Sequence, residues 1–263
     1  VVNLGTLASG QTLFGSFGDP KDADADAEVA VIVIAREGSD GDTVNTSQGG
    51  GKITIGIGNQ HIDPGDGAWF TFATGMTGTT TNQGVKLPSA GANEANGEDK
   101  IVYDGFYGSS GASFKIVQIQ GGGNDPKTNV TISAWLEDAS APQGAAFVNE
   151  LGDDTQVKIL ESSVKVTLDG VDITTSVGID QAGDGMSIIL TGVPDDATVR
   201  YLTVAADGVT SANHNRLLIE NVDGNGFDIG GFGLVGPPAF TAIGQLIGFG
   251  DDGPTASIAL TGN

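Results

Sequence analysis

Polar and apolar residues nearly alternate in the stretch Ser113-Phe114-Lys115-Ile116-Val117-Gln118-Ile119-Gln120. In an extended chain, Phe114, Ile116 and Gln118 share one face, while Val117 and Ile119 point to the other. This period of two is typical of a β-strand. Because one face is not wholly apolar, we expect this strand to be half exposed or to lie near the edge of a sheet.

Similar runs, rich in β-branched and aromatic residues, recur along the whole chain. They predict strands at residues 28–34, 52–57, 68–73, 113–120, 129–137, 157–160, 164–168, 187–190, 198–204, 216–221 and 227–234. The sequence predicts no helix longer than two turns.

Glycine accounts for 43 residues, which is far above the usual ~7%, and it is spread between the predicted strands. Clusters such as Asp63-Pro64-Gly65-Asp66-Gly67 and Asp223-Gly224-Asn225-Gly226 have the composition of turns. Many short strands joined by many turns predict an all-β fold, a jelly-roll or Greek-key β-sandwich with negligible helix. The chain is long enough for one large sandwich or two packed ones.

The composition also suggests a division of the chain. Residues 1–138 are expected to form a β-sandwich domain or subdomain, and residues 139–156, which mix Ala, Pro, Gly and acids, a crossover or linker. Residues 157–240 would form a second sandwich or complete the first. Residues 241–263 are expected to connect to a following domain or subunit, because glycines and Asp251-Asp252-Gly253-Pro254 interrupt any long strand there.

The chain is strongly acidic. Its 33 acidic and 11 basic residues give a net charge of −22, which disfavours nucleic acid and anionic lipid as partners and makes divalent cations the natural counter-charge. A plain solubility role for the acids is the alternative. There is no cysteine, and no run approaches the ~20 apolar residues of a membrane span. Residues 1–5 do not resemble a leader, so we expect a processed, excised or signal-independent export product.

The densest acidic segment predicts a Ca²⁺ site. Asp22, Asp24, Asp26 and Glu28 fall at every second position, so an extended chain would line up four carboxylates on one side. Ca²⁺ takes six to eight oxygen ligands at about 2.3–2.6 Å, and such a segment supplies several of them. The alternative is a solvated acidic loop.

Other oxygen-rich turns are weaker metal candidates, for which ordinary turn chemistry is the alternative. The segment from Asp223 begins like a Ca²⁺ loop but lacks the EF-hand spacing. These further candidate ligands are Asp40, Asp42, Asp63, Asp66, Asp223, Asn225 and Asp228.

Several segments resemble the repeats of RTX-like, type I-secreted giant bacterial surface proteins of the adhesin type. They are residues 41–47 with 56–66, 215–221 with 227–232, and 251–254. The first is similar to an "NTS…GIG…IDPGE" pattern, with Asp66 in the place of Glu. The resemblance implies an extracellular location at the bacterial cell surface, tandem repeat domains and Ca²⁺-linked folding. It also implies that the nonapeptide RTX repeats, which this sequence lacks, lie further along the full-length protein.

Catalytic patterns are weak, so we expect a protein that is not an enzyme. His61 and His214 are the only histidines and occur in unrelated contexts. The segment Gly108-Ser109-Ser110-Gly111 is one residue short of a nucleophile elbow. Paired carboxylates for glycoside hydrolysis could be assembled from so many acids, but most lie in Gly-rich turns.

Aromatic residues offer one possible ligand site. Trp69 and Trp135 each lie inside a predicted strand, where a core role is more common than an exposed one. A better platform for a sugar is the group Tyr103, Asp104, Phe106 and Tyr107. Its alternative is an aromatic cluster at a strand end.

Three functions remain open from the sequence. The first is a structural or adhesive module that spaces a ligand-binding tip from the cell, with neighbouring domains or identical subunits as partners. The second is a lectin-like module that binds surface glycans, and the third is a self-assembling subunit of an S-layer or extracellular filament.

Overall fold

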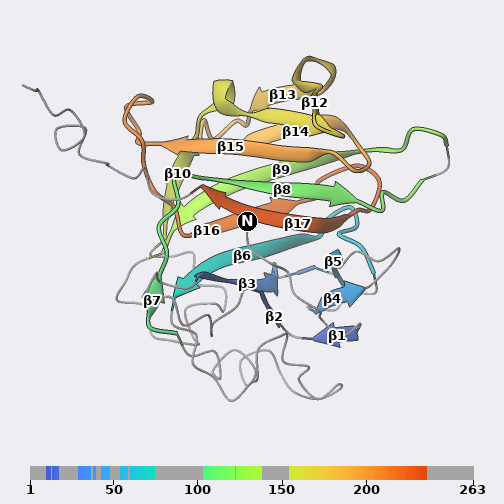
Figure 1. Ribbon diagram of the computed structural model, residues 1–263, viewed down its shortest axis with the longest axis horizontal. Helices are drawn as coiled ribbons and strands as arrows, with labels where there is room; N and C mark the ends of the chain where they lie inside the picture. The colour runs from blue at the N-terminus through green and yellow to red at the C-terminus, as the bar shows by residue number, and fades with distance from the viewer. Residues whose placement is uncertain are drawn as a thin grey trace, which may run out of the picture.

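The computed structural model describes residues 10–12, 14–17, 29–36, 38–39, 43–47, 54–58, 60–74, 103–121, 123–137 and 154–235. These residues are almost all antiparallel β-structure, so the predicted all-β sandwich is confirmed (Figure 1). The only helical elements described are two single 3₁₀ turns, η4 (Glu161–Ser163) and η5 (Thr174–Ser176). Within the described ranges, no helix is long and apolar enough to cross a membrane.

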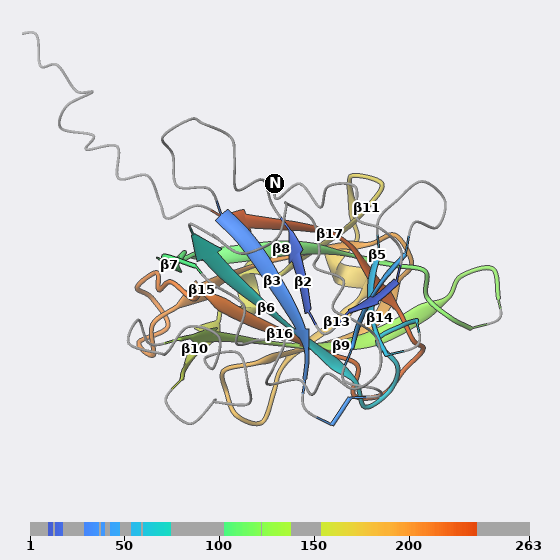
Figure 2. The same ribbon diagram turned by 90° about the horizontal axis from the view of Figure 1, so that it is seen from below.

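Two sheets face each other, and the chain crosses between them repeatedly. Figure 2 shows the layers, with β17 and β8 in one and β16 and β9 in the other. The first sheet runs in the order β2 (Phe14–Phe17), β3 (Val29–Ala35), β6 (Gly67–Thr74), β16 (Arg216–Glu220), β9 (Lys127–Leu136), β14 (Ile188–Pro194) and β13 (Gly178–Gln181). The short β7 (Gly105–Phe106) extends β6.

The second sheet runs in the order β1 (Gly10–Thr12), β4 (Val44–Ser47), β5 (Thr54–Ile57), β17 (Asp228–Val235), β8 (Gly111–Val117), β15 (Thr198–Val204), β11 (Lys165–Leu168) and β12 (Val171–Asp172). One strand belongs to both layers: β10 (Thr155–Ile159) pairs with β9 through its first residues and with β15 through its last. This strand joins the two sheets along one side and nearly closes the sandwich.

The main hydrophobic core fills the space between the sheets. Phe70 of β6 stacks on Phe232 of β17 with ring centroids 5.0 Å apart, which links the two layers directly. Burial of each such ring contributes about 1.5–3 kcal/mol. The inward positions alternate with outward ones along each strand, as the sequence pattern requires. Other members of this core are Val31, Val33, Ile55, Phe72, Ile116, Ile132, Val199, Leu217, Ile219, Phe227 and Ile229.

Each predicted strand overlaps an observed one, and the quoted stretch is β8. Its outward residues Ser113 and Lys115 are half-buried, so the expected half exposure is confirmed. Its expected position near an edge is wrong, because β8 lies between β15 and β17. The strand also ends at Val117, since Gln118 has a left-handed φ of 56°.

The two halves of the chain interleave in one core. β9 of the first half pairs with β14 and β16 of the second, and β8 pairs with β15 and β17. Described residues after 157 therefore complete the sandwich that those before 138 begin. β10 starts at Thr155, inside the segment 139–156 that the composition suggested as a linker. Residues 241–263, the expected connector, lie outside the described residues.

Candidate functional site

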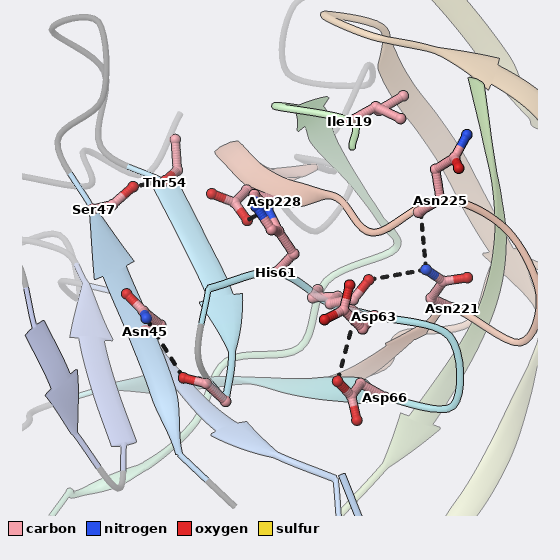
Figure 3. A network of polar contacts seen from close by, with 12 residues as sticks. Asn45, Ser47, Thr54, His61, Asp63, Asp66, Ile119, Asn221, Asn225 and Asp228 are labelled. Carbon is pink, nitrogen blue, oxygen red and sulfur yellow. Dashed lines mark hydrogen bonds and ion pairs between the residues drawn. The ribbon is translucent and has the colours of Figure 1, made fainter. Parts of the chain in front are cut away.

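Two turns that are distant in sequence lie against each other at one end of the sandwich. We call them the turn pair: residues 60–66, which follow β5, and residues 221–227, which join β16 to β17. An isolated bridge joins them, in which Ile62 N donates to Phe227 O at 2.8 Å and Phe227 N donates to Ile62 O at 3.3 Å. Gly65 N also donates to Asn221 O at 2.7 Å. Two of the predicted acidic turns therefore meet (Figure 3).

Asn221 fastens the turn pair from inside. Its Nδ2 donates to the carbonyl oxygens of Ile62 at 2.9 Å and Asn225 at 3.0 Å, and its backbone N donates to Asp66 O at 3.0 Å. Because both partners of Nδ2 are acceptors, the orientation of the amide is fixed. Asn221, which is fully buried, thus ties the two turns together through both its side chain and its backbone.

A buried histidine–carboxylate contact joins the turn pair to the first residue of β17. His61 Nδ1 is 2.8 Å from Asp228 Oδ1, and the side chains are 5% and 1% exposed. Desolvation by burial raises the pKa of Asp228, and the nearby charge of Asp63 raises it further. Hydrogen bonds from Thr54 and His61 act in the opposite direction. The Thr54 hydroxyl also lies 2.5 Å from Ser47 Oγ, so the network continues into β4.

Glycine is required where the carboxylates of this site approach the backbone. A Cβ on Gly226 would lie 2.2 Å from Asp63 Oδ1, and a Cβ on Gly56 would lie 1.9 Å from Gln60 O and 3.0 Å from Asp228 Oδ1. Real side chains do not come this close. The Gly-rich spacing around the acids therefore allows the carboxylates to pack onto the main chain.

These described acids do not form a complete Ca²⁺ shell. Three of these carboxylates already have a partner in the chain. Asp228 Oδ1 lies 2.8 Å from His61 Nδ1, and Asp66 Oδ2 lies 3.3 Å from Asp63 N. Asp223 Oδ1 accepts a hydrogen bond from Asn129 at 3.3 Å. Asn225 donates its amide to Lys127 O and accepts at its carbonyl from Thr128 Oγ1. Ca²⁺ needs six to eight oxygens, whereas within the described ranges no group of three or more His, Asp or Glu could hold a metal.

The structure thus separates the predicted ligands into two groups. Asp63, Asp66, Asp223, Asn225 and Asp228 lie in or next to the turn pair, and Asp223 and Asn225 are also bonded to β9. The remaining candidates lie outside the described residues, so their metal role stays a prediction. They are Asp22, Asp24, Asp26, Glu28, Asp40 and Asp42.

The predicted aromatic platform is divided between two environments. Tyr103 is only 3% exposed and packs on Phe106 with ring centroids 5.1 Å apart, while the half-buried Tyr107 packs on the main core. Asp104 is exposed. Desolvation by burial, followed by the charge of Glu137, raises the pKa of Tyr103 to about 12, against a lowering by Arg216.

Tyr103 belongs to a second cluster, on the face of the first sheet opposite the main core. Around it we define the arginine–tryptophan cluster: Thr71, Trp135, Glu137, Asp154 and Arg216, together with Trp69. The Arg216 guanidinium lies over the Trp69 ring, 4.5 Å from its centroid, and the two tryptophans pack edge to face at 6.2 Å. Such a cation–π contact is strengthened by burial.

Two carboxylates share the one guanidinium. Arg216 Nη1 lies 3.1 Å from Glu137 Oε2 and 3.0 Å from Asp154 Oδ2, with the three side chains 1%, 2% and 0% exposed. Sequence reasoning missed this cluster. The available signal was the alternation of Arg216 with Leu218 at the start of an apolar strand, which places a charged residue on a face shared with Leu218.

The second histidine is a core residue. His214 Nε2 lies 2.8 Å from Tyr201 OH and Nδ1 lies 3.3 Å from Thr203 Oγ1. Burial lowers the pKa of His214 to about 3, so the ring is neutral at ordinary pH. The neighbouring Ser109 points its hydroxyl at the carbonyls of Gly111 and Val235, 2.5 and 2.6 Å away. These groups hold strands together.

Comparison with known proteins gives this site no relative: the chain matches no protein family, no curated protein and no solved structure.

Proposed function

We propose that this chain is a non-catalytic structural or adhesive module of a large extracellular bacterial surface protein, folded and rigidified by Ca²⁺. The observation that carries the proposal is the turn pair, in which polar side chains lock together segments 159 residues apart. A spacer between a cell and a ligand-binding tip needs this kind of rigidity. The surface location rests on the sequence resemblance and on the acidic, cysteine-free composition.

Other buried polar groups support the same role. Tyr201 and His214 bond to each other between β15 and the segment before β16, and Arg216 of β16 binds carboxylates that flank β9 and β10. Each contact ties together segments that are separate in sequence. Charge-assisted buried contacts between distant segments resist local opening, which favours resistance to proteolysis.

The negative net charge of the chain is the physical reason to expect bound Ca²⁺. A net charge of −22 destabilises the compact state by self-repulsion, and the charge of Asp63 acts on Asp228 even in the described part. A cation that binds only the folded chain stabilises it by mass action. We place this ion at the alternating acids Asp22, Asp24 and Asp26.

Thermal melting in millimolar Ca²⁺ and in EDTA, at matched Mg²⁺ and ionic strength, tests this proposal. We expect Ca²⁺ to raise the melting temperature by several degrees and to slow digestion by a nonspecific protease. The triple variant D22N/D24N/D26N should lose most of this response, while D169N/D172N/D207N, with the same change in charge, should keep it. Superimposed melting curves in the two buffers would sink the calcium part of the proposal.

A lectin-like module is the second candidate, favoured by the half-buried Trp135 ring, which lies beside the buried charged groups of the arginine–tryptophan cluster. Sugars are recognised by stacking on aromatic faces together with planar polar groups such as carboxylates and guanidinium. A glycan array separates this function from a purely mechanical one. Binding of a defined glycan that W135A abolishes would favour the lectin.

A further inference from the structure

The arginine–tryptophan cluster contains four buried polar atoms that have no hydrogen-bond partner within the described part of the chain. They are Arg216 Nε, Trp135 Nε1, Thr71 Oγ1 and Asp154 Oδ1. Buried polar groups in folded proteins are nearly always paired, so four such atoms on neighbouring strands require an explanation. The turn pair has only one such atom, Asn221 Oδ1.

The four atoms belong to neighbouring residues on one face of the first sheet. Thr71 of β6 and Trp135 of β9 are the direct cross-strand neighbours of Arg216 on either side. Residues directly opposite each other in antiparallel strands point to the same face, so the three side chains form a row. Asp154 joins this row through its other oxygen, which lies 3.0 Å from Arg216 Nη1.

The chemistry of the four atoms defines a partner. Arg216 Nε and Trp135 Nε1 can only donate, Asp154 Oδ1 accepts, and the Thr71 hydroxyl does either. A metal cation is disfavoured because it would lie beside a guanidinium and two donors, and a free anion because Glu137 and Asp154 already surround Arg216. A group that both accepts and donates fits the set: a water molecule can pair with all four atoms, and a single hydroxyl group can pair with three of them.

We propose that the arginine–tryptophan cluster binds a hydroxyl group, supplied either by a resident water or by a polyol such as a sugar. The Trp69 and Trp135 rings give an apolar wall beside the polar row, which suits the mixed surface of either guest. The site is separate from the turn pair, which carries the mechanical role proposed above. A resident water is compatible with that role, whereas a bound sugar would favour the lectin.

The variant T71V tests whether the hydroxyl of a guest is hydrogen-bonded to Thr71. Valine matches the shape of threonine, so the substitution removes only the hydroxyl. If a guest pairs with Thr71 Oγ1, T71V loses a hydrogen bond and should melt several degrees lower. T128V is the matched control, because the buried Thr128 Oγ1 donates to Asn225 O at 2.6 Å, and its loss calibrates the effect.

The source of the hydroxyl is tested by NMR on the chain with ¹⁵N-labelled tryptophan. It has only two tryptophans, so W135F assigns both indole signals. A water cross-peak at the Trp135 indole N–H, unchanged by glucose, galactose, mannose or glycerol, identifies a resident water. A shift with one of these compounds that T71V abolishes identifies a polyol. Either result supports the proposal.

The proposal is overturned by a different pattern. If Thr71 Oγ1 has no partner, T71V removes an unpaired buried hydroxyl and should melt at the same temperature as the natural chain or higher. That result, without a water cross-peak at Trp135 and without a response to any of the four compounds, would leave no guest in the cluster.

Discussion

The turn pair and the arginine–tryptophan cluster are both buried and polar, but they differ in how completely their polar atoms are hydrogen-bonded. In the turn pair, Asn221 uses both amide hydrogens, and the adjoining Asp228 accepts from His61 and Thr54. In the cluster, two carboxylates compete for one guanidinium and four polar atoms stay without a partner. The difference is one of degree: the turn pair has one buried polar atom without a partner, whereas the cluster has four, which is the observation behind the guest that we propose there.

The largest effect is expected from R216M. This substitution leaves the carboxylates of Glu137 and Asp154 buried without a cation, which costs about 3–5 kcal/mol of unfolding free energy. Urea denaturation measures it. The exposed pair Lys127–Asp125 provides the control, because K127M should cost about 1 kcal/mol or less.

A companion variant keeps this prediction testable if R216M does not fold. The triple change R216M/E137Q/D154N removes all three charges together and should recover much of the lost stability. A chain in which R216M alone melts like the natural protein would mean that water reaches the cluster and solvates its carboxylates.

The next effect is expected from G226A in the turn pair. The added Cβ would lie 2.2 Å from Asp63 Oδ1, so the two turns must separate, at a cost of about 1–3 kcal/mol. G183A is a matched control, since no atom lies within 4 Å of its Cβ. Equal stability of the two variants in urea would contradict the close docking of the turns.

The burial of His214 predicts that the stability of the fold decreases in acid. The pKa of His214 is lowered from 6.5 to about 3 by burial, so below pH 6.5 the unfolded chain binds a proton that the folded chain does not. Stability should therefore be lost as pH falls from about 6.5 toward 3, with this residue contributing a slope of up to ~1.4 kcal/mol per pH unit. Denaturation of H214Q across this range should show a shallower slope than the natural chain.

The smallest effect is expected at Asp184, whose carboxylate is paired but largely exposed. It accepts from Met186 N at 2.8 Å and from Ser187 N and Oγ at 2.9 and 2.6 Å, and despite desolvation these bonds lower its pKa to about 2. Stability from this group is lost as pH falls from about 3.8 to 2. Because solvent screens it, D184N should cost about 1 kcal/mol or less near pH 7. If D184N lowers the unfolding free energy by more than G226A does, the expected order of the two effects is wrong.

The strands were predictable because their signal is local. Alternation in residues such as Phe114 and Ile116 identifies β8 without knowledge of its neighbours. The short β4 (Val44–Ser47) and β13 (Gly178–Gln181) were missed, since four residues with one or two apolar side chains carry little periodicity. Their pairing partners, β5 and β14, supply the hydrogen bonds that define them.

The sites were less predictable because they depend on contacts between distant residues. The turns around Asp63 and Asp223 are visible in the sequence, but their meeting depends on the bridge between Ile62 and Phe227. The burial of Arg216 likewise depends on Glu137 and Asp154, which come from other strands. Local composition shows that acids are abundant, and only the fold decides which of them become neighbours.

The pairing of His61 with Asp228, 167 residues away, has a consequence for how the chain acquires its shape. β6 likewise needs β16, and β8 needs β17, so the first sheet cannot be completed before β16 is available and the second cannot be completed before β17. Loop closure over such distances makes folding slow. Most of this sequence would therefore leave the ribosome before the sandwich could close.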